Sequence, residues 1–207
     1  MDKKTSILLI DDHTVMRMGL ASLLGTCREL FVVGDAGDGE TGLRLAAKLH
    51  PDVIIMDLMM PRMNGADATK ALIEKWPEAK ILILTTFGTA DGISKALEAG
   101  AKGAILKSAD LSELRKAIFE VANGKSYISS EIRHIMDEDP PVNALSPRQG
   151  EILQAIARGL SNTDIAKLLG ISLDMVREHT SALFQKLGAA NRTEAVTIAI
   201  RKHLLKL

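Results

Sequence analysis

The chain of 207 residues has equal numbers of basic and acidic side chains and is 46% hydrophobic, which is enough for one or two globular domains with aliphatic cores. No apolar run approaches the roughly 20 residues of a membrane span, and the run at 7–10 is too short for a signal peptide, so no membrane association is expected. Cys27 is the only cysteine, which excludes a disulfide within the chain and fits a cytoplasmic protein.

The first 123 residues alternate short apolar runs with helical patterns. These patterns predict strands at 6–10, 31–34, 53–56, 81–85 and 103–106, and helices at 14–24, 38–49, 65–76, 90–99 and 110–123. The strand runs are apolar throughout, as in strands that are buried on both faces. Five β-α units in this order predict an α/β fold, with a doubly wound parallel sheet and right-handed crossovers.

The remainder of the chain predicts a linker and a second, smaller domain. Residues 137–143 are acidic and contain two adjacent prolines, so we place a linker region at 125–144, with at most one or two helical turns at 126–136. The expected units are therefore 1–124, the linker, and an all-α domain at 145–207 with helices at 147–158, 161–168, 172–187 and 191–205. This last part has nine Lys/Arg and five Asp/Glu, a modest surplus that is compatible with an anionic partner.

Polar side chains end four of the apolar runs: Asp11 and Asp12, Asp57, Thr85, and Lys107. The carboxyl ends of parallel strands meet at one edge of a sheet, so we expect these side chains to share a pocket. Clustered carboxylates favour a hard divalent cation. A carboxylate beside a lysine and a threonine also suits nucleophilic attack on phosphorus, because both neighbours can bind the phosphoryl oxygens. The alternative is that each is an ordinary strand-end residue facing solvent.

Four segments carry a resemblance to a known family: 10–13 (IDDH), 56–65 (MDLMMPRMNG), 84–86 (LTT) and 100–107 (GAKGAILK). Through them, residues 5–123 resemble a response-regulator receiver domain, which has a flavodoxin-like (βα)5 fold. The resemblance implies that Asp57 accepts a phosphoryl group and that Mg²⁺, or another divalent cation, is held by Asp11, Asp12, Asp57 and the backbone carbonyl of Met59. It also implies that Thr85 is the switch hydroxyl and Lys107 the partner of the phosphoryl group.

Two positions depart from this resemblance. Many receivers have an aromatic residue three positions before the lysine, where this chain has Ala104, so an aromatic rotamer switch cannot operate there. Many also have a proline after the lysine, where this chain has Ser108. His13 follows the acidic pair, and we do not expect it to bind the metal.

The helices at 161–168 and 172–187, joined near Gly170, form a helix-turn-helix pattern. Val176, Leu183 and Leu187 would pack inward, although any small helical bundle has such a stripe. Five segments carry a second resemblance: 145–149 (LSPRQ), 171–172 (IS), 176–179 (VREH), 186–188 (KLG) and 192–195 (RTEA). Through them, residues 145–200 resemble the LuxR-type DNA-binding domain, with Gly150 and Met175 departing from its usual residues. By that resemblance 172–187 is the recognition helix, and the candidate DNA contacts are Arg177, Glu178, Ser181, Lys186 and Arg192.

Together the two resemblances imply a two-component response regulator of the NarL/FixJ class. We then expect a sensor histidine kinase and double-stranded promoter DNA as partners, and a homodimer after phosphorylation, formed through the helix 191–205 if its apolar face is not used for packing within the domain. Beyond its own phosphorylation and dephosphorylation the chain would not be an enzyme. The alternatives are a phosphohydrolase, which usually has a second acid where Met59 stands, and a regulator that works without phosphorylation.

Overall fold

The computed structural model describes residues 4–86, 90–138, 145–202 and 204–205. The chain divides into two compact units, Met1–Pro140 and Pro141–Leu207. Among the described helices, none is long and apolar enough to cross a membrane.

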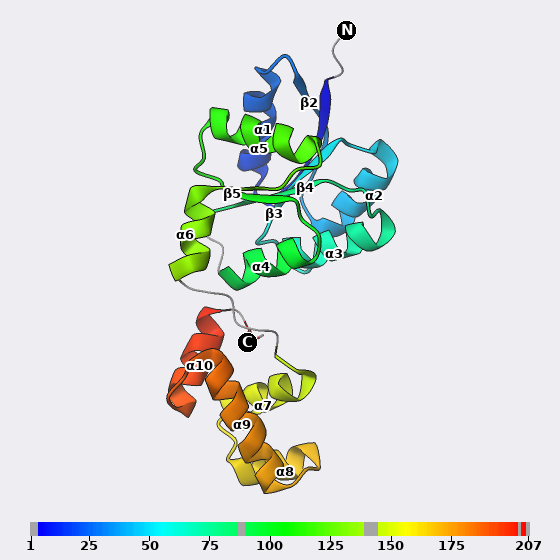
Figure 1. Cartoon of the computed structure of the whole chain (residues 1–207). Coiled ribbons are helices and arrows are strands. Elements are labelled where there is room, and N and C mark those ends of the chain that lie inside the picture. Colours follow the sequence, from blue (N-terminus) through cyan, green and yellow to red (C-terminus); the bar gives the residue numbers. More distant parts are fainter. Residues whose placement is uncertain (1–3, 87–89, 139–144, 203, 206–207) are drawn as a thin grey trace. The chain divides into compact units, whose positions relative to one another are not determined.

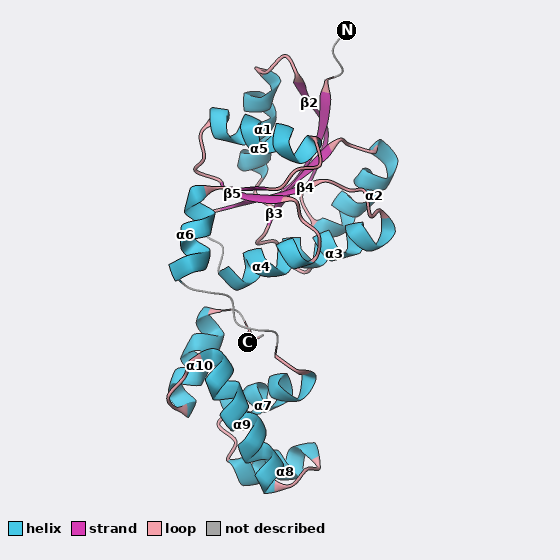
Figure 2. Cartoon of the chain, viewed as in Figure 1, coloured by secondary structure: helices cyan, strands magenta, loops and turns pink. Residues whose placement is uncertain are grey.

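The N-terminal unit is built on a parallel sheet of six strands in the order β2-β1-β3-β4-β5-β6 (Figure 2). The strands are β1 (Thr5–Ile10), β2 (Leu30–Ala36), β3 (Val53–Asp57), β4 (Ile81–Thr85), β5 (Gly103–Leu106) and β6 (Tyr127–Ile128). The first five confirm the predicted strands, with β2 longer at both ends than expected. The doubly wound α/β architecture is therefore confirmed, and a sixth strand is added to it.

Helices cover both faces of the sheet (Figure 1). The elements α1 (Thr14–Gly25) and α5 (Leu111–Ala122) pack on one face, and α2 (Gly39–Leu49), α3 (Gly65–Lys75) and α4 (Ala90–Glu98) pack on the other. Successive side chains of a strand point to opposite faces, so Leu8 and Ile10 enter one core while Ile7 and Leu9 enter the other. This alternation explains why the runs 7–10, 53–56 and 81–84 are apolar at every position.

The segment 127–138 differs most from the sequence-based expectation. The pattern predicts a linker region at 125–144, whereas Tyr127–Ile128 pairs with β5 and α6 (Ser130–Glu138) packs against the same strand. The side chain of Ile132 is fully buried in the core that also receives α2, α3 and α4. Gly103 permits this docking, because a Cβ there would collide with the carbonyl oxygen of Tyr127. The rest of the predicted linker, 139–144, lies outside the described residues.

The described residues of the C-terminal unit form four helices: α7 (Pro147–Ala157), α8 (Asn162–Leu169), α9 (Leu173–Leu187) and α10 (Arg192–Arg201). Ser146, Ser161 and Ser172 cap the first three helices by accepting hydrogen bonds from backbone N–H groups in the first turn. Gly170 and Gly188 end α8 and α9 in the left-handed conformation that glycine adopts without strain. The last helix ends earlier than the predicted 205, and residue 203 lies outside the described residues.

We predict that Ile132→Ala lowers the free energy of unfolding of the N-terminal unit by about 2–5 kcal/mol, since the substitution leaves a cavity in a core position that is 0% exposed. Denaturant unfolding of the full chain measures this. Val15→Ala is the control, because Val15 is 84% exposed and its truncation should change the stability by less than about 0.5 kcal/mol. Equal effects of the two substitutions would show that 127–138 is not part of this core.

Candidate functional site

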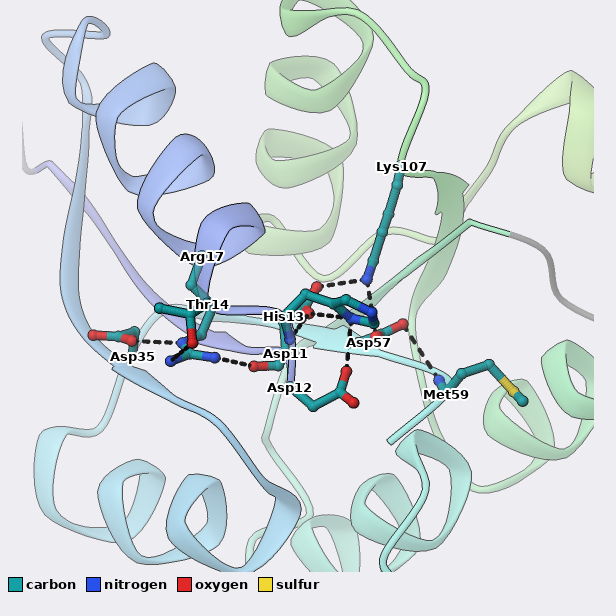
Figure 3. A network of polar contacts seen from close by, with 9 residues as sticks. All are labelled: Asp11, Asp12, His13, Thr14, Arg17, Asp35, Asp57, Met59 and Lys107. Atoms are coloured by element: carbon teal, nitrogen blue, oxygen red, sulfur yellow. Dashed lines mark hydrogen bonds and ion pairs between the residues drawn. The ribbon is translucent and has the colours of Figure 1, made fainter. Parts of the chain in front are cut away.

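Three carboxylates gather at the carboxyl edge of the sheet (Figure 3). Asp11 follows β1, Asp12 comes next, and Asp57 ends β3. The side chains of Asp11 and Asp57 are almost fully buried, at 5% and 1% exposure. One potential ligand atom from each carboxylate, and one from His13, all lie within 4.8 Å of one another. The predicted meeting of these strand ends is therefore present in the structure.

Lys107 brings a positive charge into the same pocket from the end of β5 (Figure 3). Its Nζ lies 2.6 Å from Asp11 Oδ2 and 2.9 Å from Asp57 Oδ2, and its side chain is 3% exposed. Burial alone would lower the pKa of Lys107, but the hydrogen bonds and charges of Asp11 and Asp57 together raise it above its ordinary value. The ammonium group is thus held in its charged form between the two buried carboxylates.

The surroundings of Asp57 have opposing effects on the pKa of its carboxyl group. Burial raises the pKa of Asp57, and the charge of Asp11 adds to that, while the Lys107 contact and the backbone N–H of Met59 lower it; the net pKa is raised. Met59 N donates to Asp57 Oδ1 at 3.3 Å. Desolvation leaves a carboxylate with few water molecules to remove before it reacts.

Thr85 ends β4 beside this pocket and is fully buried. Its backbone oxygen accepts a 2.7 Å hydrogen bond from Lys107 N, which ties the ends of β4 and β5 together. Among the described residues, its Oγ1 has no hydrogen-bond partner. A buried hydroxyl without a partner is unusual and costs free energy, so it fits a group that binds a ligand oxygen in another state.

The loop after Asp57 is held close to the strand by a glycine. A Cβ at Gly65 would collide with the carbonyl oxygen of Asp57, and Gly65 N donates to Leu58 O at 2.9 Å. The next helix therefore begins directly behind the carboxylate, capped by Asn64. The exposed side chain of Met59 lies at the rim of the pocket.

His13 lies closer to the acidic pair than the sequence indicated. Its Nδ1 is 2.8 Å from Asp12 Oδ1 and 3.3 Å from Asp11 Oδ1, although the side chain is 69% exposed. Arg17, which the sequence pattern did not single out, also contacts this loop: its Nη1 donates to the backbone oxygen of Asp11. Neither contact could be read from residue spacing, because both depend on how the turn after β1 folds back.

The donor set fits a hard divalent cation. Three carboxylates within a few ångströms, balanced by the single ammonium of Lys107, leave an excess of negative charge supplied by oxygen atoms. Mg²⁺ is bound in proteins by one or two carboxylates together with waters and substrate oxygens, and softer metals prefer nitrogen and sulfur. The pocket is thus suited to Mg²⁺ and to a phosphoryl group that shares it.

In the C-terminal unit, α8, the turn at Gly170 and α9 form the predicted helix-turn-helix. The stripe of Val176, Leu183 and Leu187 is buried in the core, as expected. The opposite side of α9 exposes four of the candidate DNA contacts: Arg177, Glu178, Ser181 and Lys186.

Two other predicted features of this unit are arranged differently. The guanidinium of Arg192 donates to the backbone oxygen of Leu160 and is only partly exposed, so the side chain also ties α10 to the start of the helix-turn-helix. The apolar face of α10 is divided: Ala195 and Ala199 are buried within the unit, whereas Ile200 is 45% exposed. Most of this face therefore serves packing within the domain.

Comparison with known proteins identifies both units. Residues 7–119 match the family model described as the response regulator receiver domain, and residues 143–199 match bacterial regulatory proteins of the LuxR family. A chain with this receiver and this helix-turn-helix domain is a two-component response regulator, a transcription regulator and not a classical enzyme. The chain belongs to the NarL/FixJ class of these regulators.

Three similar proteins span nearly the whole chain. The transcriptional regulatory protein LiaR of Bacillus subtilis is 38% identical, over 96% of this chain and 98% of its own. The nitrate/nitrite response regulator NarL of Escherichia coli is 35% identical, over 92% of both chains. A solved structure of two RcsB dimers bound to two parallel DNAs is 25% identical, with a TM-score of 0.71, and covers 97% of this chain and 99% of that one.

We predict that, without divalent metal, Asp57→Asn raises the stability of the receiver at about pH 7. Because the folded pKa of Asp57 is raised above its ordinary value of 3.8, the folded state binds the proton more tightly than the unfolded state. The wild-type receiver therefore loses stability as the pH rises from the pKa of Asp57 in the unfolded state to its higher pKa in the folded state. The asparagine variant has no carboxyl group at this position and does not lose this stability.

Urea unfolding in buffer with a chelator, between about pH 4 and pH 7, measures this effect. The gain should shrink as the pH falls, because the wild-type carboxyl group then becomes neutral in both states. Asp137→Asn is the control, since Asp137 is exposed on α6. A stability gain that does not change with pH would contradict the assigned cause.

Proposed function

We propose that Asp57 accepts a phosphoryl group from a sensor histidine kinase and that this controls the binding of the C-terminal domain to promoter DNA. The observation that carries the proposal is the buried arrangement of Asp57 with Lys107 and Asp11, next to the Thr85 hydroxyl, which has no hydrogen-bond partner in the described part of the chain. Asp11, Asp12, Asp57 and the backbone carbonyl of Met59 would hold Mg²⁺ or another divalent cation. Such a cation neutralises phosphoryl and carboxylate oxygens and orients them.

The residues of the chain have distinct parts in the transfer. An oxygen of Asp57 attacks phosphorus as the bond between phosphorus and the donor breaks, and the product is an acyl phosphate on Asp57. The ammonium of Lys107 lies 2.9 Å from Asp57 Oδ2 before the reaction. After the transfer it pairs with the negatively charged phosphoryl oxygens. The Thr85 hydroxyl, which has no partner among the described residues, donates to one of those oxygens.

The same chemistry allows the chain to take phosphate from a small-molecule donor and to lose it by hydrolysis. We propose that this is the extent of its catalysis. A phosphohydrolase usually has a second acid two residues after the nucleophile, and the exposed thioether of Met59 at that position cannot move a proton. A regulator that works without phosphorylation would have no need for the buried carboxylates and the buried lysine.

We predict that acetyl phosphate labels wild-type protein only when a divalent cation is present, and that Asp57→Asn abolishes the label. Intact-protein mass spectrometry measures the label directly. Asp12→Asn should still be labelled, but only at a higher Mg²⁺ concentration, because one cation ligand is lost. Labelling of the Asp57→Asn variant at the wild-type rate would refute the assignment of the phosphoacceptor.

We propose that phosphorylation changes the structure outside the pocket by moving the carboxyl ends of β4 and β5. Phosphorylation adds about two negative charges, which draw Thr85 and Lys107 and so act on β4 and β5 together. Ala104 has no ring that could change rotamer, so the change must move backbone. Ala104 O accepts a hydrogen bond from Ser129 N, the residue just before α6, and α6 is the last described element before the DNA-binding domain in the sequence. We propose β5, β6 and α6 as the route.

We predict that unphosphorylated protein is mainly monomeric and that phosphorylated protein dimerises, as RcsB is dimeric in the solved DNA complex. Light scattering at several protein concentrations, with and without acetyl phosphate, measures the mass. Asp57→Asn is the matched control and should stay monomeric in both conditions. An unchanged mass of labelled wild-type protein would contradict the proposed switch.

For the DNA, we propose that α9 lies in the major groove with Arg177 and Glu178 nearest the bases. Arginine can bind guanine through two hydrogen bonds, and glutamate can accept one from the cytosine amino group. In the structure Arg177 Nη1 is 3.1 Å from Asp174 Oδ1, an exposed pair that a base could replace at little cost. Two such domains would read a two-fold site with half-sites about one helical turn apart, with Lys186 and Arg192 on phosphates.

We predict that Arg177→Ala costs roughly 1–3 kcal/mol of binding to the preferred site and relaxes the base preference. Lys186→Ala should weaken binding to all sequences alike and flatten the salt dependence. Binding to a randomised site library at several salt concentrations separates the two effects. If Lys186 sets the preference and Arg177 only the affinity, the helix is rotated relative to this proposal.

A further inference from the structure

Arg17 of α1 lies beside the acidic pocket and contacts three separate parts of the receiver (Figure 3). Its Nε donates to Asp35 Oδ2 at 2.7 Å, its Nη1 donates to the backbone oxygen of Asp11 at 2.6 Å, and its Nη2 is 3.4 Å from Thr14 Oγ1. The side chain is 14% exposed. This guanidinium therefore joins the end of β2, the start of α1 and the turn that carries the acidic pair.

We propose that Arg17 is a positioning residue for the cation-binding pair Asp11 and Asp12, and that Asp35 is its anchor. The inference rests on the proposed function of the pocket. The hydrogen bonds that Arg17 makes within the described part of the chain do not go to these carboxylates; one of them holds the peptide group between Asp11 and Asp12. It acts on the reaction through the backbone of Asp11.

The backbone of Asp11 is held on both sides. Asp11 N donates to Ala36 O at 3.0 Å, which continues the pairing of β1 with β2, and Asp11 O accepts from Arg17. Asp35, directly before Ala36, binds the same guanidinium. One end of β2 thus fixes the N–H of Asp11 directly and its carbonyl through Arg17, at the point where the chain leaves the sheet.

Because the backbone of Asp11 is held by Ala36 and Arg17, its carboxylate is available for Lys107 and for a cation. Its Oδ2 contacts Lys107 and its Oδ1 accepts from His13 N, so the side chain has no part in holding its own peptide to β2. Without Arg17 the Asp11 carbonyl would lose its guanidinium donor. The turn would then be free to rotate its carboxylates away from Asp57.

A positive charge alone cannot replace this guanidinium. Arginine has donors in a rigid planar fork, which can serve Asp35 and the Asp11 carbonyl at once, whereas a lysine ammonium is a single point on a flexible stem. A lysine at position 17 keeps the positive charge but not the planar fork, so the two contributions can be tested separately. Loss of charge near the pocket would by itself strengthen cation binding, whereas loss of positioning weakens it.

The experiment compares full-length wild type with Arg17→Met, Arg17→Lys and Asp35→Asn. Calorimetric titration with Mg²⁺ gives the dissociation constant, and labelling by acetyl phosphate at saturating Mg²⁺ gives the rate. Arg44→Met is the matched control, because Arg44 donates to a threonine three residues before it, as Arg17 does, but on α2 and away from the pocket. Thermal unfolding of each variant measures stability separately.

We expect Arg17→Met to raise the Mg²⁺ dissociation constant about tenfold, the size of one hydrogen bond to a charged group, and to slow labelling even at saturating Mg²⁺. Arg17→Lys should restore little of the Mg²⁺ affinity or of the labelling rate. Asp35→Asn should also raise the dissociation constant and slow labelling, and Arg44→Met should match wild type in both measurements. The proposal is overturned if Arg17→Met binds Mg²⁺ as the control does, or if Arg17→Lys restores wild-type values. Absence of labelling in wild type itself would instead refute the proposed function, and the Mg²⁺ titration would still report on Arg17.

Discussion

The site depends on one buried ammonium that two buried carboxylates share. Lys107 lies within 3 Å of both Asp11 and Asp57, and the three side chains come from the ends of three strands, so the parallel sheet itself sets their spacing. Asp12 adds a third carboxylate, which leaves the pocket with more negative than positive charge. In such a poorly hydrated place this imbalance attracts a divalent cation, and a phosphoryl group can enter only with the cations that compensate it.

The hydrogen bonding of the sheet also explains how a change of charge in the pocket can move β6 and α6. Lys107 N is bonded to Thr85 O, and β5 is paired on both sides, with β4 and with the short β6. A movement of Lys107 and Thr85 toward a phosphoryl group therefore reaches β6 and α6 through backbone hydrogen bonds. Gly103 allows the close approach of β6, and Ala104 stands where an aromatic side chain could otherwise move alone.

Much of this arrangement could be predicted from the sequence, because the rule that sites form at the carboxyl edge of a parallel sheet needs only the strand ends. Asp57, Thr85 and Lys107 were found in this way. For 127–138 the sequence predicts one or two helical turns within a linker region, but neither β6 nor the packing of α6 on the core. A strand of two residues has no periodic pattern, and the acidic, proline-containing stretch that follows makes the region resemble a linker. The available signal is the helical spacing of Ile132, Ile135 and Met136, which puts three apolar side chains on one side of α6. Arg17 could not be found, because its partner in the pocket is a backbone carbonyl.

The most direct test of this account is the Mg²⁺ affinity of Lys107→Met. The ammonium of Lys107 contacts Asp11 and Asp57, two of the carboxylates that would hold a divalent cation, and the raised pKa of Lys107 keeps this ammonium charged, so the two cations would compete. Removal of the ammonium should therefore lower the Mg²⁺ dissociation constant relative to wild type, as measured by calorimetric titration of the full chain. A constant that stays equal or rises would show that Lys107 does not balance the charge of these carboxylates, and the account of the pocket would be wrong.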